Sequence, residues 1–245
     1  MAKAQDHPHH NHRERMRKRI RENGLNTLLD HELLEYLLYF THARGDTNPI
    51  AHELLRHFGS LDGVFNATYE DLLKVDGVGP RTAELLELML PLWRRYSMLQ
   101  MGPRPKLNNC QRSVEYAKSL FIGADREYLY LLCLDVQCNL IQPVQLAKGT
   151  IDEATVYSRS VLEAVLRHRA KSVVLVHNHL SPNYLPSRAD ILLTQKVITA
   201  LSSIEVDLLD HLIISQNGYY SFLQDGRMEA KREYGQVAYA ADREL

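Results

Sequence analysis

The sequence predicts two domains, an all-α N-terminal domain and a C-terminal α/β domain with a mixed sheet and flanking helices. In the first part, from Asp30 to Tyr96, apolar residues recur at helical spacing. Residues 102–106 (Gly-Pro-Arg-Pro-Lys) contain two prolines and are typical of a linker. Beyond them, short apolar and β-branched runs alternate with helical segments, which favours a sheet covered by helices.

Composition sets the broad class. The chain has 245 residues, of which 45% are apolar and 24% charged, with a net charge of -1, as in ordinary soluble proteins. No stretch approaches the roughly 18 consecutive apolar residues of a membrane span, so we expect no membrane partner. The 3 cysteines lack Cys-x-x-Cys spacing, which favours a reducing compartment, and the expected location is cytoplasmic.

The N-terminal part begins with a polar, His-rich segment, residues 1–12, that we expect to be disordered, followed by a helical domain over residues 13–101. Residues 13–21 carry six basic side chains against one acidic, which indicates either a solvated helix start or an arm that contacts phosphate. Helices are predicted over residues 30–40, 49–58, 69–75 and 81–89.

The segment Val75-Asp-Gly-Val-Gly-Pro80 resembles the turn of a helix-hairpin-helix. Two glycines allow a tight turn, and amides at the start of the next helix can hold a phosphate, although such turns also serve as plain connectors. The candidate DNA-binding residues are Gly77, Val78, Gly79 and Arg81. Residues 1–105 hold equal numbers of acidic and basic side chains, so we expect any DNA binding to be non-specific, weak and salt-dependent.

The C-terminal domain is predicted over residues 107–225, with a polar tail over residues 226–245. Helices are expected at residues 113–121, 159–169 and 188–202. Strands are expected at residues 128–134, 140–146, 172–176, 206–215 and 219–222, the last two joined by an Asn-Gly turn.

The clearest functional pattern lies between a strand and a helix. His177 and His179, spaced i, i+2, end the 172–176 strand, so both imidazoles are expected to leave the same face. Asp190 follows in the first turn of the next helix. Two imidazoles and a carboxylate form a three-ligand site with an open fourth position, as a hydrolytic zinc requires. The sequence therefore predicts one zinc per chain.

Two of these features have a structural alternative. Ser187-x-x-Asp190 is also the pattern of a capping box, in which each residue closes the helix start. Asp210-His211 lies late in a strand that can run beside the site. It indicates either a residue that holds a ligand imidazole or a buried structural histidine.

The pattern resembles the JAMM signature of the JAB1/MPN metalloproteases, and the whole chain from Arg13 to Phe222 is similar to the bacterial RadC (UPF0758) family. The similar segments are Asp30-His-Glu-Leu-Leu34, Asp46-Thr-Asn-Pro49, Gly77-Val-Gly-Pro80, Gly149-Thr-Ile151, His177-Asn-His179, Pro186-Ser-Arg-Ala-Asp190 and Asp210-His211. The resemblance implies an MPN fold (cytidine-deaminase-like), zinc ligands at His177, His179 and Asp190, and a Ser187 that hydrogen-bonds the tetrahedral intermediate.

The resemblance also implies a general-base glutamate five residues before Gly149, where this chain has Val144. Valine cannot accept a proton, so catalysis is expected to be impaired unless Asp152, Glu153 or Glu163 reaches the site. A second difference from the family lies at residues 180–182, which are Leu-Ser-Pro here and Pro-Ser-Gly after the second histidine in the family.

Two functions follow as hypotheses. The first is a zinc-dependent hydrolase of peptide or isopeptide bonds. The alternative is a DNA-binding accessory protein of repair or recombination with a structural or vestigial zinc. A zinc nucleobase deaminase is excluded, since the chain has no Pro-Cys-x-x-Cys segment to complete that signature.

Overall fold

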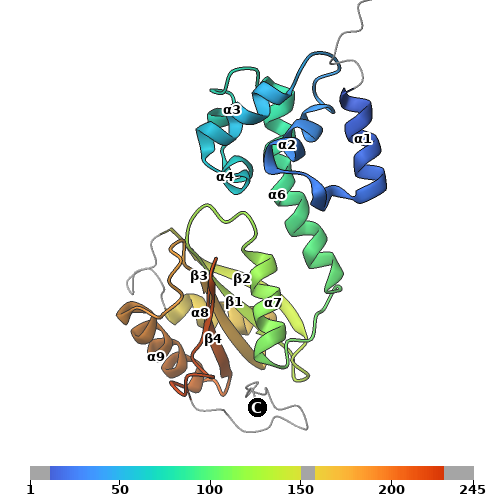
Figure 1. Cartoon of the computed structure of the whole chain (residues 1–245). Helices are drawn as coiled ribbons and strands as arrows, with labels where there is room; N and C mark the ends of the chain where they lie inside the picture. The colour runs from blue at the N-terminus through green and yellow to red at the C-terminus, as the bar shows by residue number, and fades with distance from the viewer. Residues whose placement is uncertain (1–11, 150–157, 229–245) are drawn as a thin grey trace, which may run out of the picture. The chain divides into compact units, whose positions relative to one another are not determined.

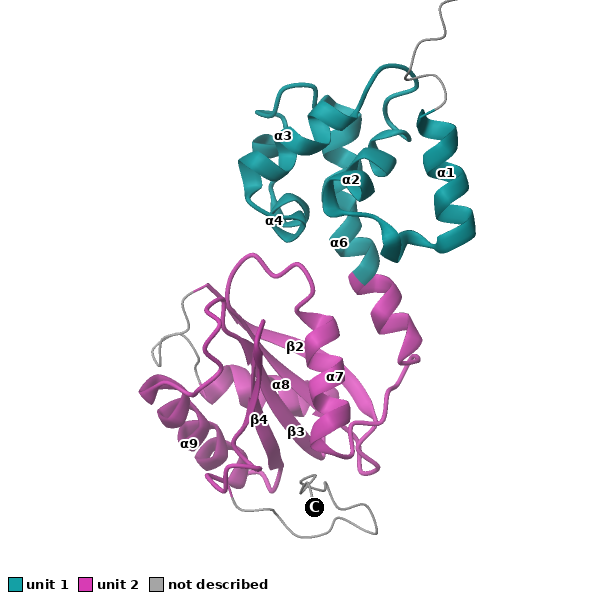
Figure 2. Ribbon diagram, in the orientation of Figure 1, with its two compact units in different colours: residues 1–93 teal, residues 94–245 magenta. Residues whose placement is uncertain are grey.

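The computed structural model describes residues 12–149 and 158–228, and the chain divides into two compact units, residues 1–93 and 94–245 (Figure 2). The division falls inside helix α6 (Pro80–Gln100), ahead of the linker expected at 102–106. In the structure, Leu107 N donates to Cys138 O and Leu140 N to Pro105 O, both at 2.8 Å. The proline-rich segment is thus bonded to the second unit. The expected tails lie outside the described residues, except for residue 12 and residues 226–228.

The first unit is helical, as predicted. Its elements are α1 (His12–Asn23), η1 (Leu25–Thr27), α2 (Asp30–Leu38), α3 (Asn48–Phe58), α4 (Leu61–Asn66), α5 (Tyr69–Leu72) and the first half of α6. Their apolar faces meet in one core, lined by Leu34, Leu38, Ala51, Leu54, Val64, Leu72, Val75, Val78, Ala83 and Leu86. Part of the basic segment serves this packing, since Arg13 donates to the carbonyl of His42 and Arg19 pairs with Glu32.

The second unit is built on a five-stranded sheet in the order β2-β1-β3-β4-β5. Its strands are β1 (Tyr128–Leu134), β2 (Leu140–Lys148), β3 (Ser172–Asn178), β4 (Asp207–Ser215) and β5 (Gly218–Ser221). The β3–β4 pair is parallel and the other neighbours are antiparallel, so the sheet is mixed, as predicted. The helices are α7 (Cys110–Leu120), α8 (Ser158–His168) and α9 (Arg188–Ser202).

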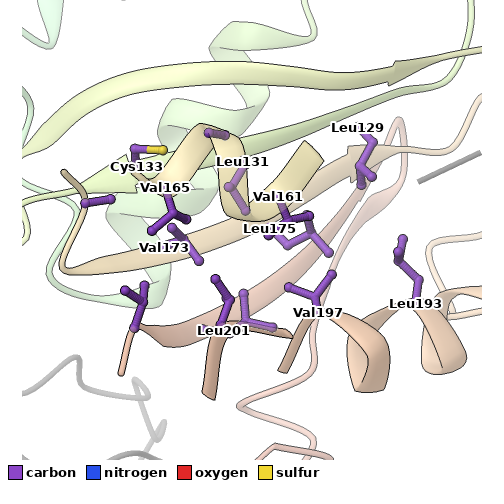
Figure 3. Packing of buried hydrophobic residues seen from close by; sticks show 14 of the residues in the cluster. Leu129, Leu131, Cys133, Val161, Val165, Val173, Leu175, Leu193, Val197 and Leu201 are labelled. Atoms are coloured by element: carbon purple, nitrogen blue, oxygen red, sulfur yellow. The ribbon is translucent and has the colours of Figure 1, made fainter. Parts of the chain in front are cut away.

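Helices cover both faces of the sheet (Figure 1). Helices α8 and α9 pack on one face through Val161, Val165, Leu193, Val197 and Leu201, which meet strand residues such as Leu131 and Leu175 (Figure 3). Helix α7 packs on the other face through Cys110, Val114, Tyr116 and Ala117. The central strands β1 and β3 are largely apolar on both faces because both faces are covered.

This arrangement positions the candidate site. Parallel strands require a crossover connection, and here α9 carries the chain from the end of β3 to the start of β4. The first turn of α9 therefore returns beside the last residues of β3, where the predicted ligands lie. Among the described residues, no helix has the length and apolar character needed to cross a membrane.

Candidate metal centre

Three side chains from the end of β3 and the start of α9 converge at one point: His177, His179 and Asp190. The Nε2 atoms of the two histidines are 2.9 Å apart. Asp190 Oδ1 is 3.3 Å from His177 Nε2, and Oδ2 is 3.6 Å from His179 Nε2. The structure thus brings together the three side chains that the sequence predicted as ligands.

These separations suit a small tetrahedral cation. Atoms bound at ~2.0–2.1 Å around a tetrahedral zinc lie roughly 3.3–3.4 Å from one another. The observed range of 2.9 to 3.6 Å brackets that value. Two imidazole nitrogens and a carboxylate oxygen also form a common protein ligand set of catalytic zinc. In the described part of the chain, no other group of three such side chains gathers in this way.

His179 forms the open side of the site. Its side chain is 15% exposed, whereas that of His177 is 1% exposed. Its Nδ1 lies 2.9 Å from the carbonyl oxygen of Asn183, and since a carbonyl can only accept, Nδ1 is the donor. The His179 backbone N–H donates to Ile214 O at 2.8 Å, which continues the pairing with β4. The ring is therefore fixed with Nε2 facing the other two ligands.

His177 is held from behind by buried polar side chains. Its Nδ1 is 2.9 Å from Nε2 of His211, whose Nδ1 is 2.7 Å from Thr194 Oγ1. Burial lowers the pKa of His177 to about 4 and the pKa of His211 well below its usual value. Both rings are thus neutral near pH 7. Of the two roles that the sequence left open for His211, contact with a ligand imidazole is present in the structure.

Asp190 is oriented by the helix start itself. Ser187 N donates to Asp190 Oδ2 at 2.7 Å, and Asp190 N donates to Ser187 Oγ at 3.2 Å, which together form a capping box. The capping interpretation and the ligand interpretation are therefore compatible, since the cap aims the carboxylate at the histidines. Ser187 is exposed, and its hydroxyl accepts from Asp190 N and also hydrogen-bonds the Asp190 carboxylate, which lowers the pKa of that carboxyl.

The site attracts positive charge. Burial raises the pKa of the Asp190 carboxyl, but the hydrogen bonds from His179 and Ser187 help to lower it by more, so the group is ionised at neutral pH. The hydrogen bond to Asp190 in turn raises the pKa of His179. The raised pKa favours the protonated form of His179 beside the carboxylate. A metal ion would compete with that proton, because a ligand imidazole must be neutral.

The structure describes two of the expected base positions, Val144 and Glu163, and neither belongs to the cluster of ligand side chains. Val144 pairs with Leu131, and Leu131 pairs with Leu175, which lies two residues before His177 on β3. Val144 packs on the apolar core between the sheet and its helices. Glu163 is exposed on α8 and forms an ion pair with Arg159. Asp152 and Glu153 lie outside the described residues.

Glu127, a carboxylate that the sequence patterns did not indicate, lies just before β1. The antiparallel pairing of β1 with β3 ends with Leu129 opposite His177, and the same register continued by two residues leads from Glu127 toward His179. The charge of Glu127 contributes to the raised pKa of His179. The missed signal was the alternation Glu127, Leu129, Leu131, which places a carboxylate on the buried face at the strand start.

Asn178 fixes the backbone around Glu127. Asn178, between the two histidines, accepts from Tyr128 N at 2.8 Å through Oδ1 and donates to Arg126 O at 2.9 Å through Nδ2. On the other side of β1, Gly149 N donates to Glu127 O at 2.8 Å. The carboxylate therefore leaves a backbone that is held on both edges.

The candidate DNA-binding residues lie in the turn between α5 and α6. Gly77 has a φ of +83°, and a Cβ at this position would meet Ile50 Cγ1 at 2.8 Å. Val78 is buried in the helical core, while Arg81 is exposed in the first turn of α6. A Cβ built on Gly79 would have no neighbouring atom within 4 Å. Packing therefore fixes the turn and leaves Gly79 and Arg81 accessible.

The helix-covered mixed sheet and the His-x-His/Asp cluster define a protein with a JAB-type domain, a class that is generally metallohydrolase-like. Residues 107–228 match the family described as RadC-like JAB domain, and residues 8–84 match the UPF0758 N-terminal family. The chain belongs to the UPF0758 family, as its relatives also show. A UPF0758 protein of Fusobacterium nucleatum subsp. nucleatum is 35% identical over 222 residues, covering 88% of this chain and 96% of the relative. UPF0758 proteins of Herminiimonas arsenicoxydans and Janthinobacterium sp. (strain Marseille) are each 35% identical over 215 residues, with the same coverage.

Proposed function

We propose that this chain is a JAMM-type zinc-dependent hydrolase of peptide or isopeptide bonds. The observation that carries the proposal is the convergence of two Nε2 atoms and one carboxylate at a point that is open on the His179 side. A zinc ion held there by His177, His179 and Asp190 supplies Lewis-acid chemistry, because it polarises a carbonyl and lowers the pKa of water to about 7.

Two residues of the chain supply the proton transfer and the stabilisation of the developing negative charge. Glu127 accepts a proton from the attacking water and returns it to the leaving amine, so the carboxylate is regenerated in each turnover. Ser187, at the exposed start of α9, turns its hydroxyl hydrogen to the carbonyl oxygen as that oxygen gains charge. This proposal differs from the expectation of an impaired site at Val144, because it assigns the proton transfer to Glu127, whose charge contributes to the raised pKa of His179.

Metal removal tests the proposed function. We expect purified protein to hold one zinc per chain by elemental analysis and to cleave members of a library of peptides and lysine-linked isopeptides. A strong chelator is expected to abolish cleavage, and added zinc to restore it. A protein that takes up no stoichiometric metal, or cleavage that survives complete metal removal, would contradict the proposal.

We propose DNA binding as a second function of the same chain, carried by the turn between α5 and α6. The observation that favours it is a turn fixed by Gly77 that leaves Gly79 and Arg81 accessible at a helix start, where backbone amides and the helix dipole attract phosphate. Because these groups contact phosphate and not base edges, binding is independent of sequence.

Substitution of Arg81 tests this second function. We expect Arg81→Ala to weaken binding of any DNA duplex about equally and to lower the salt dependence by about one charge, measured by fluorescence anisotropy over a salt series. Arg112→Ala, on an exposed position of α7, serves as the matched control. Unchanged affinity of Arg81→Ala would show that the turn is a helix connector. Gly77→Val is unsuitable, since its side chain would collide with Ile50.

A further inference from the structure

A buried row of hydrogen bonds runs from Thr194 through His211 to the metal ligand His177. It begins at a backbone carbonyl. Thr194 Oγ1 is 2.6 Å from the carbonyl oxygen of Asp190, one turn earlier in α9. A carbonyl oxygen can only accept, and a hydroxyl has one hydrogen, so that hydrogen is committed to Asp190 O.

This starting point fixes the direction of the whole row. Thr194 Oγ1 can then only accept from His211 Nδ1, which lies 2.7 Å away. A neutral imidazole that carries its hydrogen on Nδ1 has a bare Nε2. His211 Nε2 therefore accepts from His177 Nδ1 at 2.9 Å, and the lone pair of His177 lies on Nε2. Nε2 is the atom that faces His179 and Asp190.

His211 is itself held in place. Its ring stacks on Phe222 with centroids 4.7 Å apart and an interplanar angle of 10°. Its backbone N–H donates to Asp210 Oδ1, and Asp210 also accepts from Ser221 Oγ and Leu223 N. Thr194, Asp210 and His211 are all buried. The row is thus buried, and the tautomers of its histidines are set by these hydrogen bonds and not by competing water.

We propose that Thr194 and His211 are positioning residues that set the tautomer of His177, so that Nε2 is bare before a metal arrives. The inference rests on the proposed function, because it assigns the row to metal binding. Without the Thr194 hydroxyl, His211 Nδ1–H would be a buried donor with no acceptor, which is costly. The opposite tautomers then become favoured, with the hydrogen of His177 on Nε2, where it obstructs the metal.

The first test measures zinc affinity in the full chain, by competition with a chromophoric chelator. We expect Thr194→Val, which keeps the volume and removes the hydroxyl, to weaken zinc binding by roughly 10–100-fold. Thr194→Ser is expected to restore it. Thr199→Val is the matched control, because Thr199 makes the same bond to a carbonyl one turn earlier, Gln195 O, on an exposed part of α9. Equal affinity in Thr194→Val and wild type would overturn the inference.

The second test reads the tautomer directly in metal-free protein, by NMR of chains labelled with ¹⁵N-histidine. We expect the hydrogen of His177 on Nδ1 in wild type and on Nε2 in Thr194→Val. Wild-type His177 with its hydrogen on Nε2 would overturn the inference even if Thr194→Val failed to fold. Absence of zinc binding by wild type would instead contradict the proposed function, which is a different outcome.

Discussion

Glu127→Gln is expected to slow peptide or isopeptide hydrolysis by roughly 10²–10⁴-fold while leaving one zinc per chain, because glutamine keeps the shape of the side chain and cannot accept a proton. The expectation follows from the proposed role of Glu127, which precedes the Leu129–His177 pair and whose charge contributes to the raised pKa of His179. The measurement is the initial rate on a cleaved library peptide, together with zinc content. Retained zinc separates loss of the base from loss of the site.

Two further variants locate the base. Glu163→Gln is expected to be neutral, since Glu163 is exposed and paired with Arg159. Val144→Glu is expected to give no gain in rate and to lower stability, because it places a carboxylate against the apolar core beside Leu131. If the rate rises by an order of magnitude in Val144→Glu and Glu127→Gln is neutral, the general base belongs at position 144 on β2 and not at Glu127.

The combined substitution His177→Ala with His179→Ala is expected to reduce zinc from one per chain to none. Two of the three ligands are lost, and a single buried carboxylate does not hold zinc in the presence of a competing chelator. The measurement is elemental analysis after dialysis against a mild chelator, which also removes metal bound weakly by the His-rich residues 7–12. His57→Ala, at an exposed position on α3, is the control. Undiminished zinc in the double variant would place the metal elsewhere.

Local patterns were sufficient to predict much of the second unit. The predicted bounds of β1 and α9 coincide with the observed ones, Tyr128–Leu134 and Arg188–Ser202, because each element combines a clear apolar pattern with strong end signals. The ligand triad was predictable for the same reason. Its members lie within fourteen consecutive residues, 177–190, of one strand-to-helix connection.

The features that the sequence did not reveal depend on long-range pairing. Glu127 comes near enough to influence the charge of His179 only through the β1–β3 pairing, across about fifty residues of chain, and no local pattern specifies which residues face each other. The extent of α6 was also missed. The predicted helix stopped at Met89, whereas the observed one passes Pro91 and ends at Gln100, and its late residue Met98 packs against an apolar cluster of the second unit, to which it belongs. Tertiary packing outweighs the local cost of an internal proline there.

The two hydrogen bonds of Asn178 to the backbone on either side of Glu127 have a consequence for insertions and deletions in this family. Because side chains alternate between faces, a one-residue shift of β1 against β3 moves position 127 to the opposite face. Asn178 bonds on both sides of that residue and resists such a shift. A single-residue insertion in β1 that breaks these two hydrogen bonds would leave His177, His179 and Asp190 in place. It would move the Glu127 carboxylate away from the site. A relative can therefore lose activity and still bind metal without any substitution at a ligand. A change of one residue in the length of β1 is sufficient.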